Sequence, residues 1–347
     1  MRFRPRLLAL VLLSLTAVIF IHNKVMTYYT GRSPETTVAY KEYTDPTATI
    51  KPFYGHPSLM PYEDFFVPGK NTTFSLDYNF SLDGSKICKD EDPYMVIFIL
   101  SLHDKTAQRA AIRQTWGSVA TSNRWPGTTF TPIIKIVFLF GVHPIDILNE
   151  IVRKESGIHN DIVQADFVDA YANLTLKVLM GFKWMTSYCP KTKFVMKTDE
   201  DSFIVLPKLV RKLESVSMDN SILGPYVFAE GIAPYGKHKL EKEEYPLAFY
   251  PPHCKGNMYV MSSNLATKIR LVANHFKYFR IEDVFITGIL AKVFDVRHIN
   301  LKDSEYHKFK VASACELLTG SVILSQKISE IRQYQIWQTF QNKILCS

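Results

Sequence analysis

Apolar runs that alternate with helical patterns constrain the fold of this chain more than any other feature. Three runs have the β-branched and large apolar composition of buried strands: residues 94–102, 133–141 and 193–197. Segments with helical spacing lie between and after them, at residues 106–117, 145–156, 174–187 and 207–216. Strands that alternate with helices favour parallel pairing. The order therefore predicts an α/β domain with a mostly parallel central sheet flanked by helices.

Composition excludes several classes of protein. The 347 residues are 47% hydrophobic and 21% charged, which is close to the globular average and excludes wholesale disorder and a multi-span membrane protein. Five cysteines are too few for a small disulfide scaffold. The net charge of +8 is not gathered into a basic run, so nucleic-acid binding is not expected. An ordinary basic surface or an anionic small ligand accounts for this charge.

The N-terminus predicts a membrane anchor. Three arginines in residues 1–6 precede an uncharged apolar run, residues 7–21, which is shorter than the roughly 20 residues of a full span. A cleaved signal peptide needs small residues at its cleavage site, and none follow in that pattern. We therefore expect a cytoplasmic tail at 1–6 and an uncleaved signal-anchor helix at 7–29.

The next segment has the composition of a linker. Residues 30–89 carry prolines and scattered threonines without sustained periodicity, so we expect a lumenal stem. The folded domain is then expected at 90–347. Three glycosylation sequons begin at Asn71, Asn79 and Asn173, in agreement with a lumenal location.

The cysteine spacings match no zinc pattern. The five residues are Cys88, Cys189, Cys254, Cys315 and Cys346. In a lumenal protein four of them can form two disulfides and leave one thiol free. The spacing does not decide which residues pair.

An acidic cluster follows the third apolar run. Asp199 and Asp201 point to one side of an extended chain, and Glu200 points to the other. Hard carboxylate oxygens in this arrangement suit Mn²⁺ or Mg²⁺, which would bridge to phosphates of a substrate. A plain acidic turn is the alternative.

Two arginines follow the first apolar run. Arg109 and Arg113 are four residues apart and so share one helix face. Guanidinium groups near the ligand-binding edge of a sheet suit a diphosphate. The alternative is a solvated basic face.

Two later segments complete the candidate site. Residues 250–262 form a stiff turn between aromatic rings, in which Tyr250 and Gly256 suit a sugar ligand; a plain loop leading into a strand is the alternative. Glu282 and Asp283 stand at the start of a helical pattern, where capping and the helix dipole favour carboxylates. The functional alternative is a carboxylate base that faces a pocket.

Together these segments resemble the β-1,3-galactosyltransferase family. The matching motifs occur in the family's order at Arg109–Trp116, Asp166–Lys177, Lys197–Phe203, Tyr250–Tyr259 and Glu282–Phe285. The resemblance covers roughly residues 94–337 and implies a type II Golgi membrane protein. It also implies a GT-A-type nucleotide-diphospho-sugar transferase fold, with the catalytic domain at 90–347.

The resemblance further implies an activity and its residues. The expected reaction is inverting transfer of galactose or N-acetylhexosamine from a UDP-sugar to the 3-hydroxyl of an acceptor glycan on a glycoprotein or glycolipid. The implied metal ligands are Asp201 and Asp199, the implied base is Asp283 with Glu282 shaping its pocket, and the implied nucleotide-sugar residues are Arg109, Arg113, Gly256 and Tyr250.

One departure from the family leaves an alternative open. Many members carry a histidine between the late cysteine and the C-terminal tryptophan, whereas residues 315–337 here contain none. A catalytically silent relative that binds glycans or assists another transferase is therefore the second hypothesis.

Overall fold

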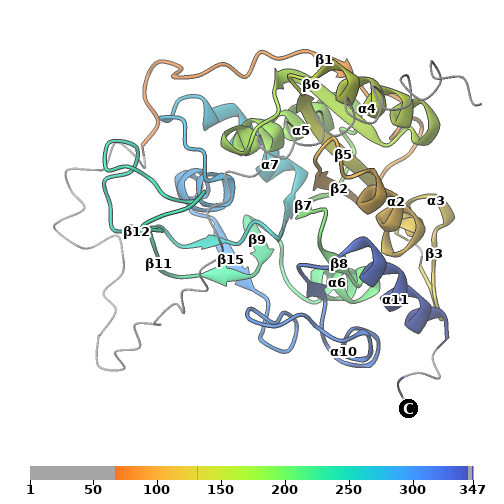
Figure 1. The fold of residues 1–347 in the computed structure, drawn as a ribbon. Helices are drawn as coiled ribbons and strands as arrows, with labels where there is room; N and C mark the ends of the chain where they lie inside the picture. Colours follow the sequence, from red (N-terminus) through yellow and green to blue (C-terminus); the bar gives the residue numbers. More distant parts are fainter. Residues whose placement is uncertain (1–66, 131, 343–345, 347) are drawn as a thin grey trace, which may run out of the picture. The chain divides into compact units, whose positions relative to one another are not determined.

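The computed structural model describes residues 67–130, 132–342 and 346 (Figure 1). The expected cytoplasmic tail and anchor helix, and most of the expected stem, lie outside these residues. Within the described ranges, no helix has the length and apolar character that a membrane crossing requires.

One eight-stranded sheet organises the structure, in the order β1-β6-β5-β2-β7-β14-β9-β15. Its strands are β1 (Phe80–Leu82), β2 (Met95–Leu100), β5 (Ile134–Val142), β6 (Ile162–Val168), β7 (Phe194–Asp199), β9 (Ser221–Gly224), β14 (Met258–Ser262) and β15 (Arg297–Asn300). The β6-β5-β2-β7 block is parallel throughout, and β9 and β15 are also parallel. The strands β1 and β14 pair antiparallel with their neighbours. The mixed α/β fold with a large, mostly parallel sheet is thus confirmed.

Helices cover both faces of the sheet (Figure 1). Along β2, alternate side chains enter two different cores: Ile97 packs with α2, α6 and α11, and Phe98 packs with α5 and α7. Every residue of β2 is therefore buried, which is why this strand reads as a continuous apolar run. The helices are α2 (Thr106–Gln114), α4 (Asp146–His159), α5 (Leu174–Tyr188), α6 (Leu206–Glu214), α7 (Ser263–Ala273) and α11 (Glu330–Gln341).

Shorter elements connect this framework. They are η3 (Trp116–Ser118), α3 (Val119–Ser122), β3 (Arg124–Trp125), β4 (Thr128–Thr129), η4 (Tyr171–Asn173), β8 (Phe203–Ile204), β10 (Tyr226–Val227), β11 (Glu230–Gly231), β12 (Phe249–Tyr250), β13 (His253–Cys254), α8 (Glu282–Val284), η5 (Phe285–Leu290), α9 (Ala291–Val293), α10 (Ala314–Thr319) and β16 (Leu324–Ser325).

The folded unit begins before the boundary predicted at residue 90. The backbone N–H of Gly69 donates to the carbonyl of His275 at 2.7 Å, and β1 adds to the edge of the sheet beside β6. Aromatic rings of this segment pack on distant partners, as Phe74 does on Tyr278 with ring centres 5.1 Å apart. These contacts are non-local, so they leave no periodic pattern in the sequence. Residues 67–89 therefore belong to the folded domain.

The structure decides the disulfide pairing that the spacing left open. Cys88 is bonded to Cys189, and Cys315 is bonded to Cys346. Cys254 is a buried free thiol. The first disulfide fixes the N-terminal segment to the end of α5.

Candidate active site

The candidate site lies where the central strands end. In the register of the sheet, Leu100 of β2 lies opposite Asp199 of β7 on one side and opposite Leu139 of β5 on the other. Because carboxyl ends of parallel strands meet at one edge, the residues after these strands come together there.

The acidic cluster begins at the end of β7 and continues into a turn, in which the Ser202 N–H donates to the Asp199 carbonyl at 3.2 Å, so the extended chain expected through Asp201 ends at Asp199. Glu200 turns inward, where its carboxylate accepts from the Ser101 hydroxyl at 2.5 Å and from the Leu102 backbone N–H at 3.3 Å. Burial raises the pKa of Glu200 to about 7. Asp199 and Asp201 remain open to solvent, the Asp199 side chain being 42% exposed. Partial desolvation and the neighbouring charge of Asp199 raise the pKa of Asp201.

Lys197 connects the acidic pair to the second half of the chain. Its Nζ lies 2.8 Å from Asp199 Oδ1 and 3.3 Å from Glu282 Oε2, and it also donates to the Gly256 carbonyl. Burial by itself lowers the pKa of this lysine, but Asp199 and Glu282 outweigh burial and raise the pKa above its ordinary value. Lys197 was not selected from the sequence as a site residue. The one sign of its role there is that it places a charge inside an apolar run.

Asp283 lies beside this lysine. Its Oδ2 accepts from the backbone N–H of Gly256 at 2.8 Å, and its Oδ1 accepts from the backbone N–H of Val284 at 2.9 Å. Lys197 and Gly256 therefore bring Asp199 and Asp283 into one site, although the two carboxylates are far apart in the sequence. A Cβ on Gly256 would lie 3.2 Å from Lys197 Nζ and 3.3 Å from Asp283 Oδ2, so a side chain there would press on both groups.

Glu282 lies behind Asp283 and is almost fully buried. Its carboxylate accepts from the Tyr259 hydroxyl and faces Lys197. Burial raises the pKa of Glu282 to about 7, and Lys197 opposes that rise. This residue therefore belongs to the wall of the site rather than to its open side.

The two arginines predicted to hold a diphosphate do not have the geometry for it. Arg109 is 0% exposed, and both Nε and Nη2 donate to Glu155, at 2.8 and 2.6 Å. Its Nη1 donates to the Leu102 carbonyl at 2.6 Å. All three nitrogens of Arg113 donate to Glu155 or Asp161. Both guanidinium groups join α2 to Glu155 of α4, and Arg113 also holds Asp161, the residue before β6, so the structure gives them a structural role.

Tyr250 likewise does not present its ring to a ligand. The residue is 4% exposed, and its ring packs against Tyr245 and Phe279 with centres 5.6 and 6.3 Å apart. The ring is part of the core beneath the turn. The prediction that Tyr250 lines the donor-sugar side is therefore not supported by its position, whereas Gly256 does lie in the site.

Three residues that sequence reasoning did not select lie across from the carboxylates. The Tyr171 hydroxyl lies 3.1 Å from His238 Nδ1, and Lys237 Nζ lies 4.9 Å from the centre of the Tyr171 ring. Burial and the charges of Asp283 and Asp199 raise the pKa of Tyr171. Only Tyr171 had a signal in the sequence, because it falls inside the motif at 166–177.

Asp199 and Asp201 are the residues of the site that could hold a divalent cation. In the part of the chain that the structure describes, no group of three or more His, Cys, Asp and Glu side chains is arranged to hold a metal. Asp199 and Asp201 nevertheless supply two hard carboxylates on the open side of the sheet edge. Such a pair fits Mn²⁺ or Mg²⁺, which commonly takes its remaining ligands from water and substrate phosphates.

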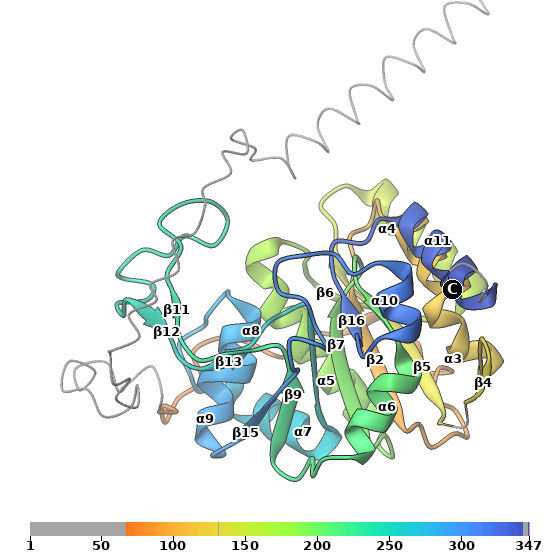
Figure 2. The ribbon, with the colours of Figure 1, turned by 90° about the horizontal axis from the view of Figure 1, so that it is seen from below.

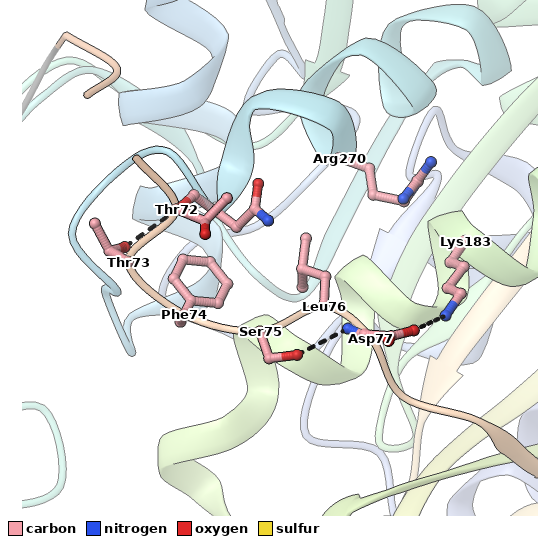
Figure 3. A pocket seen from close by; sticks show the side chains of 9 residues that line it. Thr72, Thr73, Phe74, Ser75, Leu76, Asp77, Lys183 and Arg270 are labelled. Carbon is pink, nitrogen blue, oxygen red and sulfur yellow. Dashed lines mark hydrogen bonds and ion pairs between the residues drawn. The ribbon is translucent and has the colours of Figure 1, made fainter. Parts of the chain in front are cut away.

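A separate cavity of about 630 Å³ lies between residues 72–77 and the helices α5 and α7 (Figure 3). Its lining includes Lys183, which lies 3.9 Å from Asp77, and Arg270. None of the predicted site residues lines it. The cavity results from the way the N-terminal segment crosses these helices.

Comparison with known proteins identifies the family. A family model described as galactosyltransferase matches residues 107–302. The chain is 31% identical over 307 residues to β-1,3-galactosyltransferase 1 of Homo sapiens, covering 84% of this chain and 90% of that protein. It is 33% identical over 253 residues to β-1,3-galactosyltransferase 5 of Gorilla gorilla gorilla, covering 72% of this chain and 79% of that protein.

Solved structures are similar at a lower level. The bifunctional glycosyltransferase WbbM aligns with a TM-score of 0.34 and 12% identity, covering 62% of this chain and 39% of that chain. Mouse xyloside xylosyltransferase 1 aligns with a TM-score of 0.32 and 9% identity, covering 61% and 86%.

An α/β sheet with carboxylates gathered at one edge and a galactosyltransferase family match define a sugar-transferring enzyme. This chain belongs to the galactosyltransferase family and is a hexosyltransferase. The resemblance drawn from its motifs is confirmed.

Proposed function

We propose that this protein transfers galactose from UDP-galactose to the 3-hydroxyl of an acceptor glycan, with inversion, to form a β-1,3 linkage. The relatives support galactosyl transfer. The observation that carries the proposal is the connection of Asp199 to Asp283 through Lys197 and Gly256. An N-acetylhexosamine donor is the alternative, and the acceptor is a glycan on a glycoprotein or glycolipid.

Asp283 is proposed as the base of a single displacement. The acceptor oxygen forms a bond to the anomeric carbon, the bond from that carbon to the diphosphate breaks, and UDP leaves with the electron pair. The acceptor proton passes to Asp283, whose two backbone donors orient its carboxylate. A positioned base of this kind contributes about 10²–10⁴-fold to the rate. Because inversion is one displacement, no protein nucleophile is needed.

Asp201 and Asp199 are proposed to hold the divalent cation, Mn²⁺ or Mg²⁺. When bound, this ion offsets the negative charge that develops on the departing diphosphate. Lys197 fixes the Asp199 carboxylate, and the Asp201 backbone is held by the N–H of Ile328, 2.8 Å from its carbonyl. The Asp199 carboxylate and the Asp201 backbone are therefore held in place at the sheet edge.

We also propose a single-pass type II location in the Golgi membrane, with residues 7–29 as the anchor. Two disulfides favour an oxidising compartment. Asn71 and Asn79 are exposed, and Asn173 is half-buried. All three are proposed glycosylation sites.

The test is a donor screen of the full chain with UDP-galactose, UDP-N-acetylglucosamine and UDP-N-acetylgalactosamine. We expect transfer from UDP-galactose, a β-1,3 product by NMR, and calorimetric UDP binding that depends on Mn²⁺. Asp201→Ala should lose that Mn²⁺-dependent binding, whereas Glu200→Gln, which changes the inward-facing carboxyl, should keep it. An α-linked product would refute the inverting mechanism.

A further inference from the structure

A UDP-sugar carries a diphosphate, and a cationic side chain of the protein would add to the charge that the proposed divalent cation supplies. The two arginines of α2 are engaged with Glu155 and Asp161. Lys197 is 3% exposed and is held by Asp199, Glu282 and Gly256. A cationic side chain that contacts the diphosphate must therefore come from another part of the chain. This inference rests on the proposed function.

Residues 232–248 carry a candidate. This segment connects β11 to β12, which pair with each other in a small separate sheet (Figure 2). Its Lys237 is exposed, with Nζ 4.9 Å from the centre of the Tyr171 ring. Tyr171 stands at the carboxyl edge of the sheet: Asp169, two residues earlier, accepts from the N–H of Gly141 in β5 at 2.9 Å.

Lys237 and the residue after it both contact Tyr171. His238 Nδ1 lies 3.1 Å from the Tyr171 hydroxyl, and Lys237 Nζ lies over the Tyr171 ring. The exposed Lys237 therefore lies beside Tyr171, at the carboxyl edge of the sheet where β7 ends at Asp199.

Arg280 fixes the backbone of this segment. Its Nη1 donates to the Lys237 carbonyl at 2.9 Å, its Nη2 donates to the Lys239 carbonyl, and its Nε donates to Glu244 Oε1 at 2.6 Å. Arg280 precedes the proposed base Asp283 by three residues. The segment that carries Lys237 is therefore tied to the segment that carries the base.

We propose that Lys237 binds the diphosphate of the nucleotide-sugar donor and that Arg280 is the residue that positions it. A lysine ammonium on a flexible stem is a common phosphate ligand and donates up to three hydrogen bonds. The positive charge of Lys237 stabilises the departing diphosphate more strongly than the bound donor, because negative charge grows on the diphosphate as its bond to the sugar breaks. Lys237 is then a specific contact of the donor, and Arg280 acts through it.

The experiment measures UDP binding to the full chain by calorimetry in the presence of Mn²⁺. Lys237→Gln should weaken UDP binding by about 10- to 100-fold, the usual effect of losing a charged hydrogen bond, and Lys237→Arg should recover most of it. Lys242→Gln is the control, because Lys242 is an exposed lysine of the same segment. It should bind as wild type does.

Arg280→Gln tests the positioning role. It should weaken UDP binding, and adding Lys237→Gln to it should weaken binding further by much less than Lys237→Gln does alone. UDP should also protect the bond after Lys237 from trypsin in the wild type but not in Arg280→Gln. Fully additive effects, with equal protection in both proteins, would refute the positioning role.

The outcomes separate this inference from the proposed function. Wild-type affinity in Lys237→Gln, with Asp201→Ala inactive in binding, would overturn the role of Lys237 and leave the enzymatic proposal intact. Failure of the wild type to bind UDP with Mn²⁺ would overturn both.

Discussion

Gly256 donates its backbone N–H to Asp283 Oδ2 at 2.8 Å. The same glycine accepts from Lys197, which in turn holds Asp199. One residue without a side chain therefore joins the proposed base to the proposed cation ligands. The distance between the proposed base and the proposed cation ligands depends on this contact.

Replacing Gly256 with alanine should disturb this contact. The new Cβ would lie 3.2 Å from Lys197 Nζ and 3.3 Å from Asp283 Oδ2, so both side chains must shift. Small displacements of reacting groups cost up to about 100-fold in rate, and we expect kcat/KM to fall by about 10- to 100-fold with little change in Tm. Gly157→Ala in α4 is the control, since its Cβ meets nothing within 4 Å. Equal activity in both variants would contradict the tight fit at Gly256.

Asp283→Asn should separate binding from chemistry. Asparagine keeps the shape of the side chain and one oxygen that accepts hydrogen bonds, but it cannot take the proton from the hydroxyl of the acceptor glycan. We expect kcat to fall by about 10²–10⁴-fold, while Mn²⁺-dependent UDP binding stays near that of the wild type. Steady-state kinetics measure the fall in kcat, and calorimetry measures UDP binding. Turnover at the wild-type rate would remove Asp283 as the base.

Arg109→Gln should affect stability rather than nucleotide binding. Arg109 is buried and forms a paired contact with Glu155, and breaking a buried ion pair costs about 3–5 kcal/mol. The exposed pair of Arg153 with Glu150 offers a matched control: Arg153→Gln should cost under about 1 kcal/mol. Urea unfolding measures both, and UDP affinity of the folded protein should not change. A stable Arg109→Gln protein that fails to bind UDP would return this arginine to the nucleotide site.

Glu200 should make the free energy of unfolding depend on pH. Burial raises its pKa from 4.5 to about 7, so the folded state keeps a proton that the unfolded chain releases. The stability this supplies is complete below pH 4.5 and is lost as the pH rises through about 7. Glu200→Gln mimics the protonated form, so its stability relative to the wild type should increase from about pH 5 to about pH 8. A difference in the free energy of unfolding between Glu200→Gln and the wild type that stays constant across this pH range would contradict the shifted pKa.

Local patterns in the sequence determined the central strands and the place of the acidic cluster at the end of one of them. β2 was visible because a strand buried on both faces is apolar along its length, and β7 was visible from the apolar residues Phe194–Met196 at its start. Glu200 was expected to point away from Asp199 and does, but the turn that follows β7, and not an extended chain, turns it inward. The family was visible in motifs, each of which is a short local segment.

Only the tertiary structure decided which residues become partners. Arg109 shows the difference: its helix face was visible in the sequence, but its partner Glu155 lies on another helix and removes it from the site. The disulfide pairing, the approach of Gly256 to Asp283, and the place of Lys237 were likewise absent from the sequence. Periodicity records which way a side chain points relative to its neighbours in the chain, whereas pairing depends on how distant segments pack. Packing fixed these contacts by bringing the segments together at one edge of the sheet.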